Sequence, residues 1–444
     1  MKAKRAIVAA VAAVFAGITA FALTGCEWFS FDRNKAQDVP ETLGYTGNTA
    51  AWLTSKASSP RSDALQLYED AKKSGAIASN VTFLDFLKAI NDDSASLTAP
   101  LRSSVAIRTP GGAGSGVVYK LKTIGSTTSA YIITNYHVTY GARTFNTTFY
   151  GETSSSALSA TYVGGSESED IAVLLVDITG KTNFVLPISR ESEDSDKFDP
   201  RDSDDVKVGE KVYAIGNLLG NGISVVSGIV SVQAEYNTFA KISDSTRSNE
   251  MLTMRIDAPV AHGNSGGGLF DGDGRLVGIV NGGMENAKNG DDTIDVDNYG
   301  FAIPANRAIS VAQNVIDKFE EKGSDKAVVA VRARLGAWHV DSSEGKYDDD
   351  TESVDIVERV SITSVDSQCP FSEEEILGKT LTQIIVKDAS GGLVVNKMIT
   401  REHQIKSVLY NVRSGFTVEL HFAEGDPIAK TYSSANNNYN FENA

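Results

Sequence analysis

The most informative segment of this 444-residue chain is Gly263-Asn264-Ser265-Gly266-Gly267. A serine between glycines can present its hydroxyl and the neighbouring backbone N–H groups to a single carbonyl group. That arrangement suits acyl transfer, in which a nucleophile and donors for the developing oxyanion converge on one carbon. A run of glycine and serine is also typical of a surface turn. This segment alone therefore leaves both interpretations open.

Two upstream segments carry the other groups that acyl transfer needs. His137 lies in Thr134–Val138, directly after an apolar run. Asp170 is the first residue of the segment Asp170–Leu175. The apolar residues that follow it are typical of a buried strand. A base, an orienting acid and a nucleophile therefore follow one another along the chain, which favours the catalytic interpretation of Ser265.

The order His, Asp, Ser is that of the chymotrypsin group, and the chain resembles the HtrA/Deg branch of the trypsin-like serine proteases from about residue 105 to 304. The matching segments are Gly112–Val118, Thr134–Val138, Asp170–Leu174, Val208–Asn217, Val226–Ser231, Ile256–Gly267 and Tyr299–Pro304. The resemblance implies a mainly β fold with two six-stranded antiparallel β-barrels and a site in the cleft between them. The many short, β-branched segments punctuated by glycine favour barrels or sandwiches.

The resemblance also implies a serine endopeptidase that hydrolyses peptide bonds of unfolded or misfolded proteins. Ser265 is the expected nucleophile, His137 the general base, and Asp170 the acid that orients the imidazole. The backbone N–H groups of Gly263, Asn264 and Ser265 are the expected oxyanion hole. Protein or peptide substrates are the expected partners, and neither a cofactor nor a metal ion is expected.

Neighbouring residues are alternatives for two of these roles. His262 is too close to Ser265 in the sequence to point easily at its hydroxyl across a cleft, and it is expected to line its own loop. Glu169 precedes Asp170 and is expected to face solvent, and Asp257 is expected to be structural. The remaining histidines are expected to be ordinary surface or strand residues: His339, His403 and His421.

The substrate pocket is expected to be uncharged. Enzymes of this type that select Lys or Arg carry an acid six residues before the serine, and Pro259 stands there in this chain. The expected pocket residues are Pro259, Val260, Ile279, Val280 and Asn281. Cleavage after small or medium aliphatic residues follows from such a pocket.

Two departures from the family pattern affect the serine loop. His262 and Gly268 stand where the family usually has proline. Because proline restricts the backbone and glycine frees it, the loop is expected to be less rigidly preset than in relatives. These departures support a second hypothesis, a non-proteolytic surface binding or chaperone-like lipoprotein with a vestigial triad.

The composition excludes one class of partner. The formal net charge is −16, and nucleic-acid binding is not expected because it needs a basic surface. Only two cysteines are present, Cys26 and Cys369. If Cys26 is modified, no disulfide can form within the chain, and Cys369 is expected to be a small buried residue.

The N-terminus has the pattern of a targeting segment. Three cations precede an apolar run from Ala6 to Leu23, and Thr24-Gly25-Cys26 follows. This resembles the lipobox of bacterial lipoproteins, which implies that residues 1–25 are a lipoprotein signal peptide and that Cys26 carries the lipid. An uncleaved anchor or a plain secretory signal is the alternative. The expected location is extracytoplasmic, with a lipid anchor in the bacterial cell membrane.

Composition and pattern also divide the rest of the chain. The expected segments are a tether (26–61), a short helical segment (62–100), a trypsin-like protease domain (101–323), a PDZ-like domain (329–424) and a polar C-terminal tail (425–444). The PDZ-like domain resembles the circularly permuted kind found in HtrA proteases. Aromatic N-terminal segments help to build trimers in that family, so a homo-trimer is implied by the same resemblance.

Overall fold

The computed structural model describes residues 68, 72, 73, 78, 81, 96–181, 185, 187, 188, 200–283, 286–289, 292–295, 298–323, 326–348, 353–433 and 441–443. The predicted signal peptide, the lipidation site Cys26, the tether and most of the helical segment 62–100 lie outside these residues. The chain divides into one unit of residues 1–98 and another of residues 99–444. None of the helices in the described ranges has the length and apolar character needed to cross a membrane.

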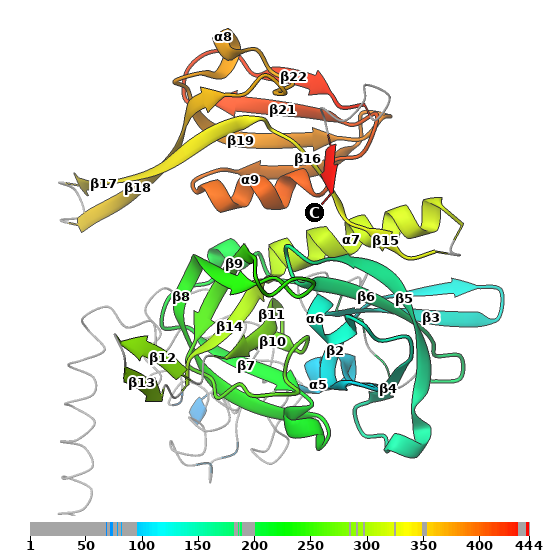
Figure 1. Ribbon diagram of the computed structural model, residues 1–444. Helices are drawn as coiled ribbons and strands as arrows, with labels where there is room; N and C mark the ends of the chain where they lie inside the picture. The colour runs from blue at the N-terminus through cyan, green and yellow to red at the C-terminus, as the bar shows by residue number, and fades with distance from the viewer. Residues whose placement is uncertain are drawn as a thin grey trace, which may run out of the picture. The chain divides into compact units, whose positions relative to one another are not determined.

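Six strands that follow the short helix α5 (Thr98–Ser103) close into an antiparallel barrel, here the first barrel (Figure 1). They are β1 (Ser104–Thr109), β2 (Gly112–Ile124), β3 (Thr127–Thr134), β4 (Phe145–Phe149), β5 (Leu158–Ser166) and β6 (Ile171–Asp177). The sheet order is β5-β4-β1-β2-β3-β6, and a further pairing of β5 with β6 closes the ring. Alternate residues of these strands, such as Val105 and Ile107, fill the barrel core.

The second barrel is built from β7 (Lys211–Gly216), β8 (Ser224–Ala240), β9 (Ser248–Ile256), β10 (Gly268–Asp271), β11 (Leu276–Gly283) and β14 (Gly300–Pro304). These strands close in the order β10-β11-β14-β9-β8-β7 (Figure 1). Between β11 and β14, strands β12 (Asn286–Asn289) and β13 (Asp292–Asp295) form a separate hairpin. The prediction of a mainly β fold with two six-stranded barrels is confirmed.

A long helix, α7 (Ala305–Glu321), leaves the second barrel. Its apolar residues recur at helical spacing, and Ala308, Val311, Ala312 and Val315 are fully buried. The helix ends before Gly323, whose φ of +73° is the left-handed conformation that glycine adopts most easily. The short strand β15 (Val328–Val329) then pairs in parallel with β5 and returns the chain to the first barrel.

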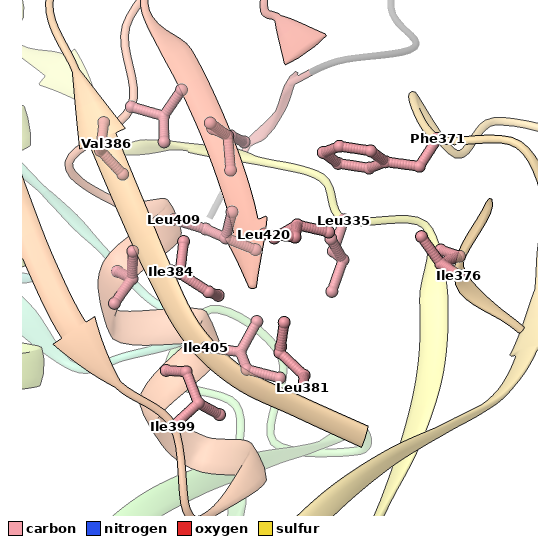
Figure 2. Packing of buried hydrophobic residues seen from close by; sticks show 14 of the residues in the cluster. Leu335, Phe371, Ile376, Leu381, Ile384, Val386, Ile399, Ile405, Leu409 and Leu420 are labelled. Atoms are coloured by element: carbon pink, nitrogen blue, oxygen red, sulfur yellow. The ribbon is translucent and has the colours of Figure 1, made fainter. Parts of the chain in front are cut away.

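The C-terminal domain has its own sheet and core. Its elements are β16 (Val331–Ala333), β17 (Ala337–Asp348), β18 (Ser353–Val365), α8 (Glu373–Ile376), β19 (Thr380–Lys387), β20 (Leu393–Met398), α9 (Glu402–Leu409), β21 (Thr417–Phe422), β22 (Ile428–Thr431) and β23 (Phe441–Asn443). The main sheet runs β17-β18-β19-β21-β22, with β20 beside β19. Figure 2 shows Ile405 and Leu409 of α9 packed beside Ile384 and Leu420 of the sheet.

The last residues of the chain differ from their prediction as a polar tail. Within 425–444, β22 pairs with β21 and β23 pairs with β16. Tyr432 is fully buried in the domain core, where its ring lies edge-on to Phe441. The polar composition of this stretch hides its few apolar side chains, and the sheet therefore extends beyond residue 424.

Polar groups on one face of α7 join the two-barrel domain to the C-terminal domain. Asn314 Nδ2 donates to the main-chain oxygens of Val331 (2.7 Å) and Tyr410 (2.8 Å). One turn further along, Asp317 accepts a hydrogen bond from Arg413 at 2.8 Å. Because these contacts have defined geometry, the start of the C-terminal domain and the end of α9 are fixed against α7.

Candidate active site

The histidine is carried by a single helical turn, α6 (Tyr136–Thr139), directly after β3. Asn135 forms the N-terminal cap of this turn and is completely buried. The side-chain amide of Asn135 donates to the main-chain oxygen of Asp170 at 2.9 Å, and the N–H of Tyr136 donates to the same oxygen at 3.1 Å. The turn that bears His137 is therefore tied to the backbone of the acid.

The Asp170 carboxylate holds His137 by two hydrogen bonds. The backbone N–H of His137 donates to Oδ1 at 2.8 Å, and ring atom Nδ1 lies 2.7 Å from Oδ2. Asp170 has a φ of +47°, a left-handed conformation that costs a non-glycine residue about 1–3 kcal/mol. The hydrogen bonds to its carboxylate and main-chain oxygen offset that cost and keep the acid aimed at the imidazole.

The environment of the His137 ring favours its charged form. Burial by itself would lower the pKa of His137, but the hydrogen bond and the negative charge of Asp170 outweigh burial and raise that pKa. A carboxylate at Nδ1 also selects the tautomer in which Nδ1 carries the proton. In the neutral ring, Nε2 is then left as a proton acceptor.

We expect the His137 ring to titrate above the ordinary histidine value of about 6.5 when it is followed by histidine NMR. Because the folded-state pKa is the higher one, protonation contributes stability that is present below about pH 6.5 and lost as the pH rises through the folded value. In the variant Asp170→Asn the midpoint should fall, since burial then acts alone. A midpoint at or below the ordinary value in the unmodified protein would contradict the raised pKa.

The serine loop, residues 261–268, lies against the segment that bears His137. Ser115 of β2 donates its N–H to the main-chain oxygen of Ser265 (2.8 Å). The main-chain oxygen of Ser115 accepts a hydrogen bond from Thr134 Oγ1 (2.7 Å). Gly266, with a φ of +85°, packs so closely here that a Cβ atom would lie 2.2 Å from the Ser115 oxygen. The loop of the second barrel is therefore seated on the first barrel beside the histidine turn.

Asn281 lies between the acid and the serine. Its side-chain Nδ2 donates to Asp170 Oδ2 at 2.5 Å, and its main-chain oxygen accepts the Ser265 hydroxyl at 2.9 Å. Both Ser265 and His137 are described, and no hydrogen bond joins the Ser265 hydroxyl to the His137 ring. Sequence patterns predicted Asn281 as a pocket residue and did not reveal this bridging position.

Some N–H groups of the serine loop donate hydrogen bonds within the protein, and others are left without an acceptor in the described residues. Asn264 donates its N–H to the Ala261 oxygen at 3.1 Å, so it is not available as the oxyanion donor that was predicted. In the described part of the chain, the N–H groups of Gly263 and Ser265 have no hydrogen-bond partner. The adjacent oxygens are held elsewhere, with Gly263 O accepting from Ser115 Oγ (2.6 Å) and His262 O from the Leu219 N–H (2.8 Å).

The serine loop is also better anchored than its two missing prolines suggested. Gly266 N–H donates to the Val280 oxygen and Val280 N–H donates to the Gly267 oxygen, both at 2.8 Å. Gly268 belongs to strand β10 and is paired with β7 and β11. Backbone hydrogen bonds therefore constrain the loop where the family usually has proline.

The predicted pocket residues do not share one environment. Ile279 and Val280 are completely buried, and Val280 belongs to the core of the second barrel, so neither side chain is accessible to a ligand. That part of the prediction is wrong, because the strand that supports the serine loop directs these side chains inward. Pro259 is exposed and Val260 is half-buried beside Gly283 and Gly300.

The residues weighed as alternatives to the base and the acid, and the remaining histidines, differ in their environments. Glu169 is completely buried, so the prediction that it faces solvent is wrong. His262 is exposed, and Asp257 accepts the Ile229 N–H at 2.5 Å, which is a structural role. His403 is only 8% exposed, with Nε2 3.2 Å from Asp204 Oδ1, and is not an ordinary surface residue. No group of three or more metal-ligating side chains gathers within the described ranges.

Comparisons with known proteins agree with this geometry. The family model described as a trypsin-like peptidase domain matches residues 114–279. Serine protease Do-like HtrA of Bacillus subtilis (strain 168) is 31% identical over 309 residues, which cover 66% of this chain and 62% of that protein. Serine protease Do-like HtrA of Lactococcus lactis subsp. cremoris (strain MG1363) is 28% identical over 312 residues, covering 69% and 66%. The match spans less than two thirds of the length of either relative.

A solved structure, HtrA-type protease AlgW with tripeptide, aligns with 77% of this chain and 96% of its own at 20% identity and a TM-score of 0.43. The matched family model spans the segments of His137, Asp170 and Ser265. The chain is therefore similar to HtrA-type serine proteases, and its residues 114–279 match a trypsin-like peptidase domain.

Proposed function

We propose that this protein is a serine endopeptidase that uses His137, Asp170 and Ser265 to hydrolyse peptide bonds of protein or peptide substrates. The observation that carries the proposal is the Asp170 carboxylate. It binds Nδ1 of His137 and accepts a hydrogen bond from Asn281, whose main-chain oxygen accepts the Ser265 hydroxyl. The N–H groups of Gly263 and Ser265, which have no partner among the described residues, support it, because an oxyanion needs free donors.

In the proposed reaction, Nε2 of His137 removes the Ser265 proton as Oγ attacks the scissile carbonyl carbon. The N–H groups of Gly263 and Ser265 bind the oxyanion of the tetrahedral intermediate. His137 then returns the proton to the leaving amine, and the acyl-enzyme forms. Water, deprotonated by His137, attacks this ester, and the proton passes back to Ser265 as the product acid leaves. Asp170 keeps the imidazole in the required tautomer throughout.

The resting position of the Ser265 hydroxyl is compatible with this mechanism. The proposed reaction requires the Ser265 hydroxyl to exchange its hydrogen bond to the Asn281 oxygen for one to Nε2 of His137, by rotation about the Cα–Cβ bond. A hydrogen bond of this kind contributes about 0.5–1.5 kcal/mol net. Each oxyanion donor is worth about 3 kcal/mol of barrier, so the cost of rotation is small beside the stabilisation of the transition state.

A fluorophosphonate probe tests the proposal directly, because it reacts only with an activated serine. We expect covalent labelling of the wild-type protein at Ser265, located by mass spectrometry, and release of peptides from an unfolded protein substrate. Ser265→Ala should show neither. Undiminished cleavage by Ser265→Ala would contradict the proposal.

One observation favours a second function, a non-proteolytic binding or chaperone-like protein with a vestigial triad. The Ser265 hydroxyl donates to the Asn281 main-chain oxygen at 2.9 Å. A serine hydroxyl that donates to this oxygen instead of to His137 is not activated as a nucleophile. Absence of labelling with or without peptide ligands, together with suppressed aggregation of an unfolded client, would favour this second function.

We propose cleavage after small or medium aliphatic residues of unfolded or misfolded proteins. Pro259 is accessible at the position where an acid would select Lys or Arg, and Val260 lies beside it. Mapping of cleavage sites in an unfolded substrate tests this specificity. A predominance of Arg before the cleaved bond would contradict it.

The proposal for location and organisation rests on sequence patterns. Residues 1–25 serve as a signal peptide, and lipid on Cys26 anchors the mature chain outside the cytoplasm, with 26–61 as tether. Separate cores support a protease domain of 101–323 and a PDZ-like C-terminal domain. The family resemblance supports a homo-trimer. Mass spectrometry of the mature N-terminus and light scattering test the anchor and the oligomer.

A further inference from the structure

Glu169 lies at the centre of a buried ion cluster beside the proposed active site. Its carboxylate accepts hydrogen bonds from Arg307 Nη1 at 2.8 Å and from the Tyr410 hydroxyl at 3.1 Å. Lys406 Nζ lies 2.5 Å from the same carboxylate. Glu169, Arg307 and Tyr410 are each completely buried. We call Glu169, Arg307, Lys406 and Tyr410 the Glu169 cluster.

The Glu169 carboxylate is charged in this environment. Burial would raise the pKa of Glu169, but Arg307 and Lys406 outweigh burial and lower that pKa to about 2. Two cations therefore face one carboxylate that is itself closed to solvent. Buried ion pairs of this kind add little net stability, because desolvation cancels most of their attraction. Stability alone does not account for the cluster.

Four residues that contact Glu169 or Arg307 come from one face of α9 and its C-terminal cap, Tyr410. His403, Lys406, Ser407 and Tyr410 recur at the spacing of one helix face. Arg307 Nε donates to Ser407 Oγ at 3.0 Å, and Nη2 donates to the His403 oxygen at 2.9 Å. The other face of α9 packs into the core of the C-terminal domain. The helix therefore links the core of one domain to a residue of the other.

Glu169, which the other members of the cluster hold in place, directly precedes Asp170 in the chain. The peptide group that joins Glu169 to Asp170 is planar, so its orientation also sets the position of the Asp170 nitrogen. On the other side, Asn135 and Tyr136 hold the Asp170 oxygen. The backbone of Asp170 is therefore held on both its nitrogen side and its oxygen side. Such restraint from the surroundings is what allows a residue to keep a strained φ of +47°.

We infer that Glu169 is a positioning residue for Asp170, and that Arg307 and Lys406 hold it in place, so that the C-terminal domain contributes to the geometry of the triad. This inference rests on the proposed function. Loss of a cluster cation lets the turn at Glu169 relax, Asp170 moves away from Nδ1 of His137, and general-base catalysis weakens while the substrate contacts stay intact.

The test compares two lysines of the C-terminal domain. Lys406→Met removes one cation but leaves Glu169 paired with Arg307, so the fold is retained. Lys397→Met is the matched control, because Lys397 also reaches acids of the protease domain, with Nζ 2.6 Å from Asp202 and 2.6 Å from Asp204. Lys397 and Lys406 have similarly small exposed fractions, 19% and 26%. Lys406→Arg restores the charge.

We expect Lys406→Met to lower kcat about tenfold with KM changed less than about twofold, because misplacement of a catalytic group lowers the rate steeply. Lys406→Arg should recover most of the activity, and Lys397→Met should stay within about twofold of wild type. Equal losses in Lys406→Met and Lys397→Met would overturn the inference, because a general loosening of the domains would then explain both.

A second measurement does not depend on turnover. In the background of Ser265→Ala, NMR follows the pKa of the His137 imidazole, which is one of five histidines in the chain. Adding Lys406→Met should lower the midpoint by about half a unit, because the imidazolium loses alignment with Asp170. An unchanged midpoint would overturn the inference. If the wild type hydrolyses nothing, the proposed function fails, but this titration still decides the role of Glu169.

Discussion

Replacement of Asp170 by asparagine should lower kcat about 10⁴-fold, which is the size of effect that this substitution has in triads of this type. Asp170 Oδ2 accepts from two donors, Nδ1 of His137 and Nδ2 of Asn281. Both carboxylate oxygens are needed as acceptors, because the backbone N–H of His137 donates to Oδ1. An asparagine side chain has only one oxygen and cannot replace both. The NH₂ group of the new side chain then faces a donor, and the imidazole is driven to the tautomer in which Nε2 carries the proton.

The kcat on a chromogenic or unfolded protein substrate measures this effect. Asp257→Asn is the matched control, because Asp257 is exposed and, in the described structure, its carboxylate accepts only the backbone N–H of Ile229 in β8. That control should stay within about twofold of wild type, and both variants should keep the strand content of the wild type by circular dichroism. Activity of Asp170→Asn within tenfold of wild type would remove Asp170 from the proposed mechanism.

Gly266→Ala should lower kcat by at least about 10²-fold and the free energy of unfolding by about 1–3 kcal/mol. A Cβ atom at this position would lie 2.2 Å from the Ser115 oxygen and 2.3 Å from Thr134 Oγ1. These two atoms are hydrogen-bonded to each other on the first barrel, beside the Ser115 N–H that donates to the Ser265 oxygen. A φ of +85° adds strain for any residue with a side chain. The loop must therefore move, and Ser265 moves with it.

The same substitution at Gly112 is the control, because a Cβ atom there meets nothing within 4 Å and its φ lies outside the left-handed region. Gly112 lies on β2, the strand that also carries Ser115. Gly112→Ala should leave kcat and the free energy of unfolding close to the wild-type values in urea titrations. Wild-type activity in Gly266→Ala would mean that the close contact with Ser115 does not set the position of the nucleophile.

Local sequence pattern was enough to predict much of this molecule. Glycine-punctuated, β-branched segments predicted barrels or sandwiches, and the family resemblance narrowed these to two barrels. These features depend on residues close together in the chain, so a short window contains the information. The polar stretch after residue 424 was misjudged because β22 and β23 find their partners far away, in β21 and β16.

The candidate site divides in the same way. Residue type and spacing singled out His137, Asp170 and Ser265, and the structure brings the first two to 2.7 Å. Sequence patterns missed Glu169 as a buried residue, because an acid beside a strand normally faces water. They also misassigned Ile279 and Val280, because a strand that supports a loop can direct its side chains into the core.

Residue identity and short-range periodicity established which chemical groups are present, in which order, and that the chain forms short strands typical of barrels or sandwiches. Tertiary structure alone decided that Asn281 bridges to Asp170, 111 positions away, and that Glu169 meets Arg307 and Tyr410, 138 and 241 positions away. It also decided where the Ser265 hydroxyl points. Such contacts arise only when packed domains exclude water and force buried charges to find partners, and no local pattern encodes that choice.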